Sequence, residues 1–161
     1  MKLRAASGAG FSLVELVATL IVVGILAAYA IPRWVDRTGF ESRGFFDQAQ
    51  GLVRYAQKIA IAQRQSAPKG PIYVVITVSQ IRVCYDVGCA SAVTDPISGA
   101  PLVLNAPADG AVTLAPVTTF SFSGAGAPSV GAQLAINVNS TGVGDANRTF
   151  YVEAVTGYVH D

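Results

Sequence analysis

Charged residues are unusually few in this sequence. Asp, Glu, Lys and Arg make up 13% of its 161 residues, about half the share in an average globular domain. The balance of 11 basic and 10 acidic residues gives a formal net charge of +1. Such a balance excludes a strong overall attraction to nucleic acid or to acidic membranes.

Histidine and cysteine are also scarce, with one histidine, His160, and two cysteines, Cys84 and Cys89. A structural zinc site needs about four nitrogen or sulfur ligands, so we expect no metal. The sequence has no G-x-S-x-G, H-E-x-x-H or P-loop pattern, the spacings that nucleophilic, zinc-dependent and phosphate-binding sites require. We therefore expect neither an enzyme nor a cofactor, and we predict that His160 is an exposed strand residue.

The two cysteines predict a disulfide that closes a small turn. They enclose only Tyr85–Gly88, in which Asp86 and Gly88 favour a turn. Closing so short a loop stabilises the fold by about 2 kcal/mol on chain-entropy grounds. A redox role would rather use C-x-x-C spacing at the start of a helix.

The most informative segment is the apolar run Phe11–Ile31, in which Glu15 is the single charged side chain. A helix of this length spans about 30 Å, the thickness of a bilayer core. A secretory signal cleaved after Ala28-Tyr29-Ala30 would have a shorter apolar run and leaves Glu15 unexplained. A plain membrane anchor fits the length, but a buried carboxylate costs about 2.5–3.5 kcal/mol there and calls for a function.

The residues at the start of this run carry a family resemblance. Gly10-Phe11-Ser12-Leu13-Val14-Glu15-Leu16 closely resembles the processing signature of type IV prepilins and secretion pseudopilins. In that family a short basic leader is cut after the glycine, and the new N-terminal phenylalanine is N-methylated. The resemblance implies cleavage between Gly10 and Phe11, an assembly role for Glu15 and a helix bend at Pro32.

The same resemblance implies a location and partners. The precursor would cross the inner membrane once, with a periplasmic C-terminal domain, and then enter a type IV pilus or a type II secretion pseudopilus. Its partners would be other pilin or pseudopilin subunits, the prepilin peptidase and methyltransferase, and the inner-membrane assembly platform. Val53–Gln57 and Val152–Tyr158 look like minor pilins, H-type pseudopilins and accessory subunits of mannose-sensitive haemagglutinin pili, which indicates a structural or priming subunit.

Periodicity predicts an α+β fold with one long N-terminal helix on an antiparallel sheet. We expect a leader (1–10), a transmembrane or filament-core helix (11–31), an amphipathic helical half (32–66) and a β-sheet region (67–161). Apolar residues at helical spacing form one stripe in the amphipathic half, namely Phe45, Ala49, Leu52, Val53, Ala56, Ile59 and Ala60. Alternating patterns predict strands at 72–78, 81–85, 120–122, 134–138, 150–152 and 158–160, with long loops from 89 to 131 around one or two strands near Val112 and Phe120.

The sequence is also compatible with a function of a different class, that of a binding module. Six basic residues, Arg43, Arg54, Lys58, Arg64, Lys69 and Arg82, could form a basic face, and some minor pilins bind DNA. These charges are spread out and lack interleaved aromatic residues, so a solvated helix face explains them better. The alternative is a membrane-tethered binding module, displayed by the filament for DNA uptake or surface adhesion.

Overall fold

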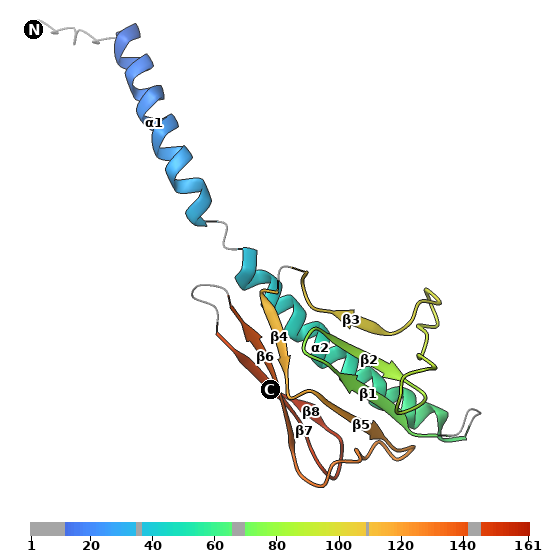
Figure 1. Ribbon diagram of the computed structural model, residues 1–161. Helices are drawn as coiled ribbons and strands as arrows, with labels where there is room; N and C mark the ends of the chain where they lie inside the picture. Colours follow the sequence, from blue (N-terminus) through green and yellow to red (C-terminus); the bar gives the residue numbers. More distant parts are fainter. Residues whose placement is uncertain (1–11, 35–36, 66–69, 109, 142–145) are drawn as a thin grey trace, which may run out of the picture. The chain divides into compact units, whose positions relative to one another are not determined.

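The computed structural model describes residues 12–34, 37–65, 70–108, 110–141 and 146–161; for 28–34, 37–40 and 65 it describes the backbone only. The chain divides into two compact units, Met1–Asp36 and Arg37–Asp161. Within the described residues, the first unit contains helix α1 (Leu13–Trp34), and the second contains helix α2 (Arg37–Ala62) and the strands of two β-sheets (Figure 1).

Helix α1 begins directly after Ser12. The Val14 N–H donates to the Ser12 hydroxyl at 3.3 Å, and the Glu15 and Leu16 N–H groups donate to the Ser12 carbonyl at 3.0 and 3.1 Å. A serine in this position satisfies donors that the first turn of a helix leaves unpaired. Pro32 lies near the end of α1, and the bend predicted for it stays a prediction because its side-chain surroundings lie outside the described part.

Helix α2 (Arg37–Ala62), followed by a short 3₁₀ helix (Gln63–Gln65), is amphipathic. Its buried apolar side chains recur at helical spacing and include Phe45, Phe46, Ala49, Val53, Ala56 and Ala60. Leu52 and Ile59 pack against this core from its margin. The predicted apolar stripe is therefore confirmed as the core-facing side of α2.

The first sheet consists of β1 (Ile72–Ile76), β2 (Gln80–Cys84), β3 (Val103–Asn105) and β5 (Thr118–Phe122). Its strand order is β3-β2-β1-β5, and every neighbouring pair is antiparallel. Val74 of β1 lies opposite Val83 of β2 on one side and Phe120 of β5 on the other. All three side chains are buried, as expected where one face of an antiparallel sheet covers a core.

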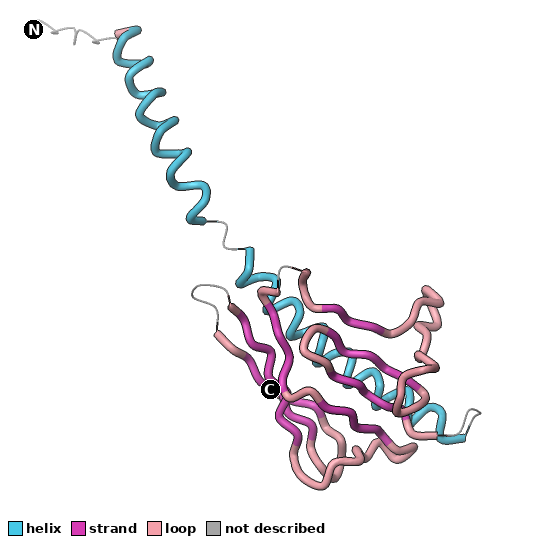
Figure 2. Tube along the Cα trace, viewed as in Figure 1, coloured by secondary structure: helices cyan, strands magenta, loops and turns pink. Residues whose placement is uncertain are grey.

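The second sheet consists of β4 (Val112–Ala115), β6 (Leu134–Ser140), β7 (Arg148–Val152) and β8 (Val159–His160) in the order β4-β6-β7-β8. Ile136 and Phe150 face each other across β6 and β7 and are buried. Phe150 also meets Phe46 of α2 edge-on, with ring centroids 5.8 Å apart. Helix α2 contacts strands of both sheets, so one helical face closes one common core (Figure 2).

The single sheet predicted from the sequence is thus two sheets. The chain leaves the second sheet at Ala115 and joins the first at Thr118, with Pro116 between them. Proline has no N–H to donate and cannot continue a ladder. The strands predicted near Val112 and Phe120 are confirmed as β4 and β5, whereas β3 was missed.

Candidate functional site

Glu15 stands in the first turn of α1. Every described side chain of this helix, from Leu13 to Ala27, is exposed; Leu13 is 79% exposed and Leu20 64%. A carboxylate near a helix N-terminus is favoured by the partial positive charge of the free N–H groups. Among the described residues no ion pair to Glu15 is recorded, so its environment within the chain is an uncovered apolar helix.

The predicted processing site, Gly10 and Phe11, lies outside the described residues, and cleavage there stays a prediction. Within α1 a methyl group added at Gly24 would meet nothing within 4 Å, so the helix surface is open at that point. In the part of the chain that the structure describes, no helix combines the length and the apolar character needed to cross a membrane.

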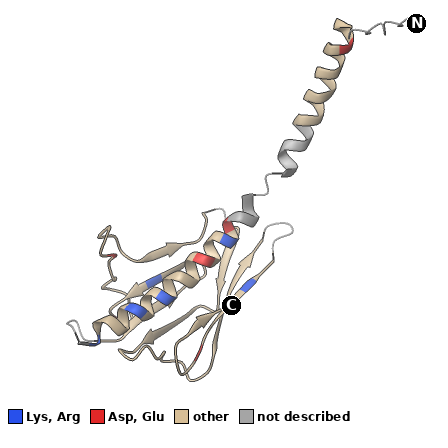
Figure 3. Ribbon diagram, turned by 180° about the vertical axis from the view of Figure 1, so that it is seen from behind, with Lys and Arg blue, Asp and Glu red and all other residues tan. Residues whose placement is uncertain are grey.

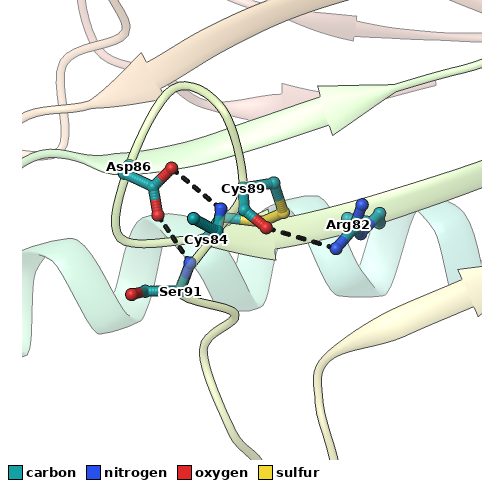
Figure 4. The surroundings of a disulfide bond; sticks show 6 residues. Arg82, Cys84, Asp86, Cys89 and Ser91 are labelled. Carbon is teal, nitrogen blue, oxygen red and sulfur yellow. Dashed lines mark hydrogen bonds between the residues drawn. A yellow bond between two sulfur atoms is a disulfide. The ribbon is translucent and has the colours of Figure 1, made fainter.

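The predicted disulfide between Cys84 and Cys89 is present, with the two Cα atoms 5.1 Å apart (Figure 4). Asp86 organises the loop between them. Its carboxylate accepts the Ala90 N–H at 2.9 Å and the Ser91 N–H at 2.7 Å. These backbone hydrogen bonds lower the pKa of Asp86, since they favour its charged form.

The end of this loop is held from the neighbouring strand. Cys89 adopts a left-handed backbone with φ of 56°, unusual for a residue other than glycine. Its carbonyl accepts a hydrogen bond from the Arg82 guanidinium at 3.3 Å. Both cysteines are buried. The loop is therefore a rigid structural element in which the sulfurs are not displayed for exchange.

Two of the six basic residues, Arg54 and Arg82, make hydrogen bonds within the fold. Arg54 donates to the Val159 carbonyl at 3.0 Å and Arg82 to the Cys89 carbonyl, so both serve the fold. Arg43 and Lys58 are exposed on α2, and Arg64 is exposed on the short helix that follows it. Figure 3 colours the basic residues along α2 blue. Lys69 lies outside the described residues.

His160 has partners that the sequence did not predict. Its Nε2 lies 2.9 Å from Glu153 Oε1. Its ring stacks with Tyr151 at 5.6 Å and with Tyr158 at 5.5 Å between centroids, at interplanar angles of 29° and 17°. We call these four residues, Tyr151, Glu153, Tyr158 and His160, the C-terminal corner. The signal in the sequence was the i, i+2 spacing of Tyr158 and His160 in the predicted strand 158–160, which places both on one face.

The hydrogen bond between the imidazole of His160 and the carboxylate of Glu153 changes the pKa of both groups. It raises the pKa of His160 and lowers the pKa of Glu153, because each charged form stabilises the other. Gln133 adds a second donor to Glu153 Oε1 at 2.5 Å. Among the described residues, no group of three or more metal-binding side chains occurs.

Helix α2 holds the turn that precedes the C-terminal corner. The Gln57 side-chain amide donates to the carbonyls of Gly126 and Thr156, each at 2.9 Å. Gly157 has φ of +67°, and a Cβ there would collide with the Gly126 carbonyl oxygen. Glycine is therefore required at this position, and the turn is fixed against α2.

Comparison with known proteins shows similarity to a curated pilus component and to crystal structures of a minor pilin. No family model matches the chain. Over 59 residues the chain is 39% identical to the type IV narrow pilus major component PilA5 of Thermus thermophilus, a match covering 37% of this chain and 51% of that protein. The match thus spans about half the length of the curated relative.

The solved structures are two crystal forms of the type IV minor pilin FimU of Pseudomonas aeruginosa. They superpose with TM-scores of 0.52 and 0.54 at 13% and 14% sequence identity. The alignments cover 73% and 74% of this chain and 90% and 87% of the FimU chains. The predicted α+β, pilin-like fold is confirmed by this likeness.

Proposed function

We propose that the protein is a type IV pilin-like subunit that is cleaved after Gly10 and assembles into a filament through the helix that begins at Phe11. The observation that carries this proposal is Glu15, one carboxylate on an exposed apolar helix attached to a domain with the pilin fold. The similarity to a pilus component of Thermus thermophilus supports it. The conclusion is a structural role rather than catalysis.

Cleavage supplies a partner for Glu15, which has no ion pair among the described residues. Hydrolysis after Gly10 frees an amine on Phe11, which N-methylation leaves positively charged at neutral pH. In a bundle of these helices the Glu15 carboxylate of one copy pairs with the amine of the next. Removing one member of a buried ion pair is far more costly than replacing both by apolar groups. The pair therefore fixes the axial register between copies more than it adds stability.

Before assembly the run Phe11–Ile31 would hold the precursor in the inner membrane as a single pass, with the domain on the periplasmic side. The prepilin peptidase and methyltransferase act at Gly10 and Phe11, and the assembly platform then extracts the subunit. The same apolar surface is covered first by lipid and later by neighbouring copies. Small residues such as Gly24 allow such helices to approach closely.

Within this class we favour a minor pilin or an H-type pseudopilin that primes the filament. The pair Cys84 and Cys89 lies in the middle of the chain and closes a short loop, whereas major pilins usually close a C-terminal loop. The resemblance to accessory subunits of mannose-sensitive haemagglutinin pili rests on Val53–Gln57 and Val152–Tyr158.

The test replaces Glu15 by Gln in the full chain, in cells that assemble the filament. We expect Glu15→Gln to be processed but to be lost from sheared filaments, since the amine of the neighbouring copy then lacks its counter-charge. Glu41→Gln is the matched control, because Glu41 is an exposed glutamate of α2. Equal incorporation of both variants would contradict the proposal.

A further inference from the structure

The C-terminal corner lies on the β7 and β8 side of the second sheet and combines aromatic faces with a carboxylate. The rings of Tyr151, His160 and Tyr158 are nearly parallel, and Tyr158 is 61% exposed. Both hydrogen bonds recorded for the Glu153 side chain end on Oε1. Aromatic faces and carboxylates both attract cations.

In the part of the chain that the structure describes, this corner receives no Lys or Arg. Apart from the pairing of His160 with Glu153 inside the corner, no hydrogen bond, ion pair or cation–π contact joins a Lys or Arg side chain to these four among the described residues. Asp161 follows His160 directly and adds a second acidic side chain nearby. A cation from outside the chain therefore has a complementary place to bind, whereas an anionic ligand such as nucleic acid is disfavoured.

The corner is also rigid before anything binds. The Glu153 N–H donates to the Tyr158 carbonyl at 3.0 Å, and the Gly157 N–H donates to the Glu153 carbonyl at 2.9 Å. Arg54 and Gln57 of α2 anchor the same segment. A site fixed in this way loses little conformational entropy on binding.

The matching charge is found in the second half of α2. From Gly51 to Gln65 the sequence contains Arg54, Lys58 and Arg64 and no acidic residue. Arg54 is engaged with the Val159 carbonyl. Lys58 is exposed, and no partner is recorded for its ammonium within the described residues. Its neighbours three and four positions away, Arg54, Tyr55, Ile61 and Ala62, leave that charge uncompensated.

We propose that the C-terminal corner binds the Lys58 ammonium of a second copy of this chain, with Glu153 as counter-charge and the Tyr158 ring as cation–π face. This inference rests on the proposed assembly and adds a contact between the domains. Because donor and acceptor belong to different surfaces, the contact is heterologous and repeats from copy to copy. Such contacts build open-ended filaments rather than closed dimers.

Zero-length carbodiimide crosslinking tests this contact, because it joins an amine to a carboxylate only when they are paired. Filaments assembled from equal parts of ¹⁴N- and ¹⁵N-labelled chains, each processed from the whole precursor, are treated near neutral pH and digested. We expect mixed-isotope peptides that join Lys58 to Glu153. Filaments whose crosslinks join Lys58 only to other carboxylates would overturn the inference.

Charge exchange provides the second test. We expect Lys58→Glu and Glu153→Lys each to lower filament yield by about five-fold, as loss of an ion pair and a cation–π contact implies, and the double variant to restore it. Arg43→Glu is the matched control and should not rescue Glu153→Lys. Rescue by Arg43→Glu alone, or unchanged filaments in both single variants, would overturn the contact to Lys58 and leave the proposed function standing. Failure of the unaltered chain to form any filament would remove both.

Discussion

The two units of this chain differ in how far their apolar side chains are covered by the rest of the unit. In the second unit the apolar side of α2 is covered by two sheets, and Val53, Ala56 and Phe150 are fully buried. In α1 most of the described large apolar side chains, such as Leu20 and Ile25, are more than half exposed. Since exposed apolar surface of this extent marks an interaction site, the comparison teaches that the domain is complete by itself and α1 is not.

The largest expected effect is a loss of stability of the second unit, caused by a substitution that does not change α1. Phe150→Ala removes a fully buried ring that packs on Phe46 and should lower the free energy of unfolding by about 3–5 kcal/mol. Leu20→Ala, at a side chain 64% exposed, should change it by less than about 0.5 kcal/mol. Urea unfolding of the full chain in detergent, followed by near-UV circular dichroism, measures both. Equal losses would refute the contrast between the units.

A smaller effect tests how the domain holds its C-terminal turn. Gly157→Ala should destabilise the fold by about 2–3 kcal/mol, because its Cβ would collide with the Gly126 carbonyl and its backbone is left-handed. Gly99→Ala is the matched control, since φ there is +70° but nothing lies within 4 Å; it should cost about 1 kcal/mol. The same unfolding experiment gives both values, and similar losses would show that the close approach of Gly157 to the Gly126 carbonyl is unimportant.

The smallest effect is a pH dependence at the C-terminal corner. The raised pKa of His160 means that its contribution is present at low pH and lost as pH rises through that value. The lowered pKa of Glu153 means that its contribution is lost as pH falls through that value. The pair should therefore favour the folded corner most under mildly acidic conditions, between the ordinary pKa values of 4.5 and 6.5.

An NMR titration of the His160 ring measures this contribution. Glu153→Gln should bring the pKa of His160 down toward its ordinary value, because the carboxylate that favours the imidazolium is gone. Glu41→Gln, at an exposed position of α2, should leave the titration of His160 unchanged. A titration that Glu153→Gln does not alter would show that the pair is absent in solution.

Local sequence patterns predicted the helices and strands of this fold better than they predicted which strands pair with one another. The buried face of α2 could be predicted, since Phe45, Ala49, Val53 and Ala56 follow the helical period. The division into two sheets could not, because a period of two assigns side chains to faces but does not name the neighbouring strand. Strand β3 was missed because three residues, Val103–Asn105, carry too short an alternation.

The candidate sites differ in the same way, since some could be predicted from the local sequence and others depend on contacts between distant residues. The disulfide followed from close spacing in the sequence. The roles of Asp86 and His160 depend on Ser91, Glu153 and Tyr151, and side-chain geometry rather than residue type decides those contacts. Glu15 could be singled out from its apolar neighbours alone, since a carboxylate in such a run needs an explanation wherever the helix is placed. Its partner had to be inferred from chemistry.

The central claim is that α1 is completed by other copies only after a new amine is made at Phe11. N-terminal mass analysis of the native protein, taken from membranes and from sheared filaments, tests this most directly. We predict that the first peptide begins at Phe11 and carries one methyl group on its amine. A working chain that still begins at Met1, or one cut to begin at Ile31, would contradict the account.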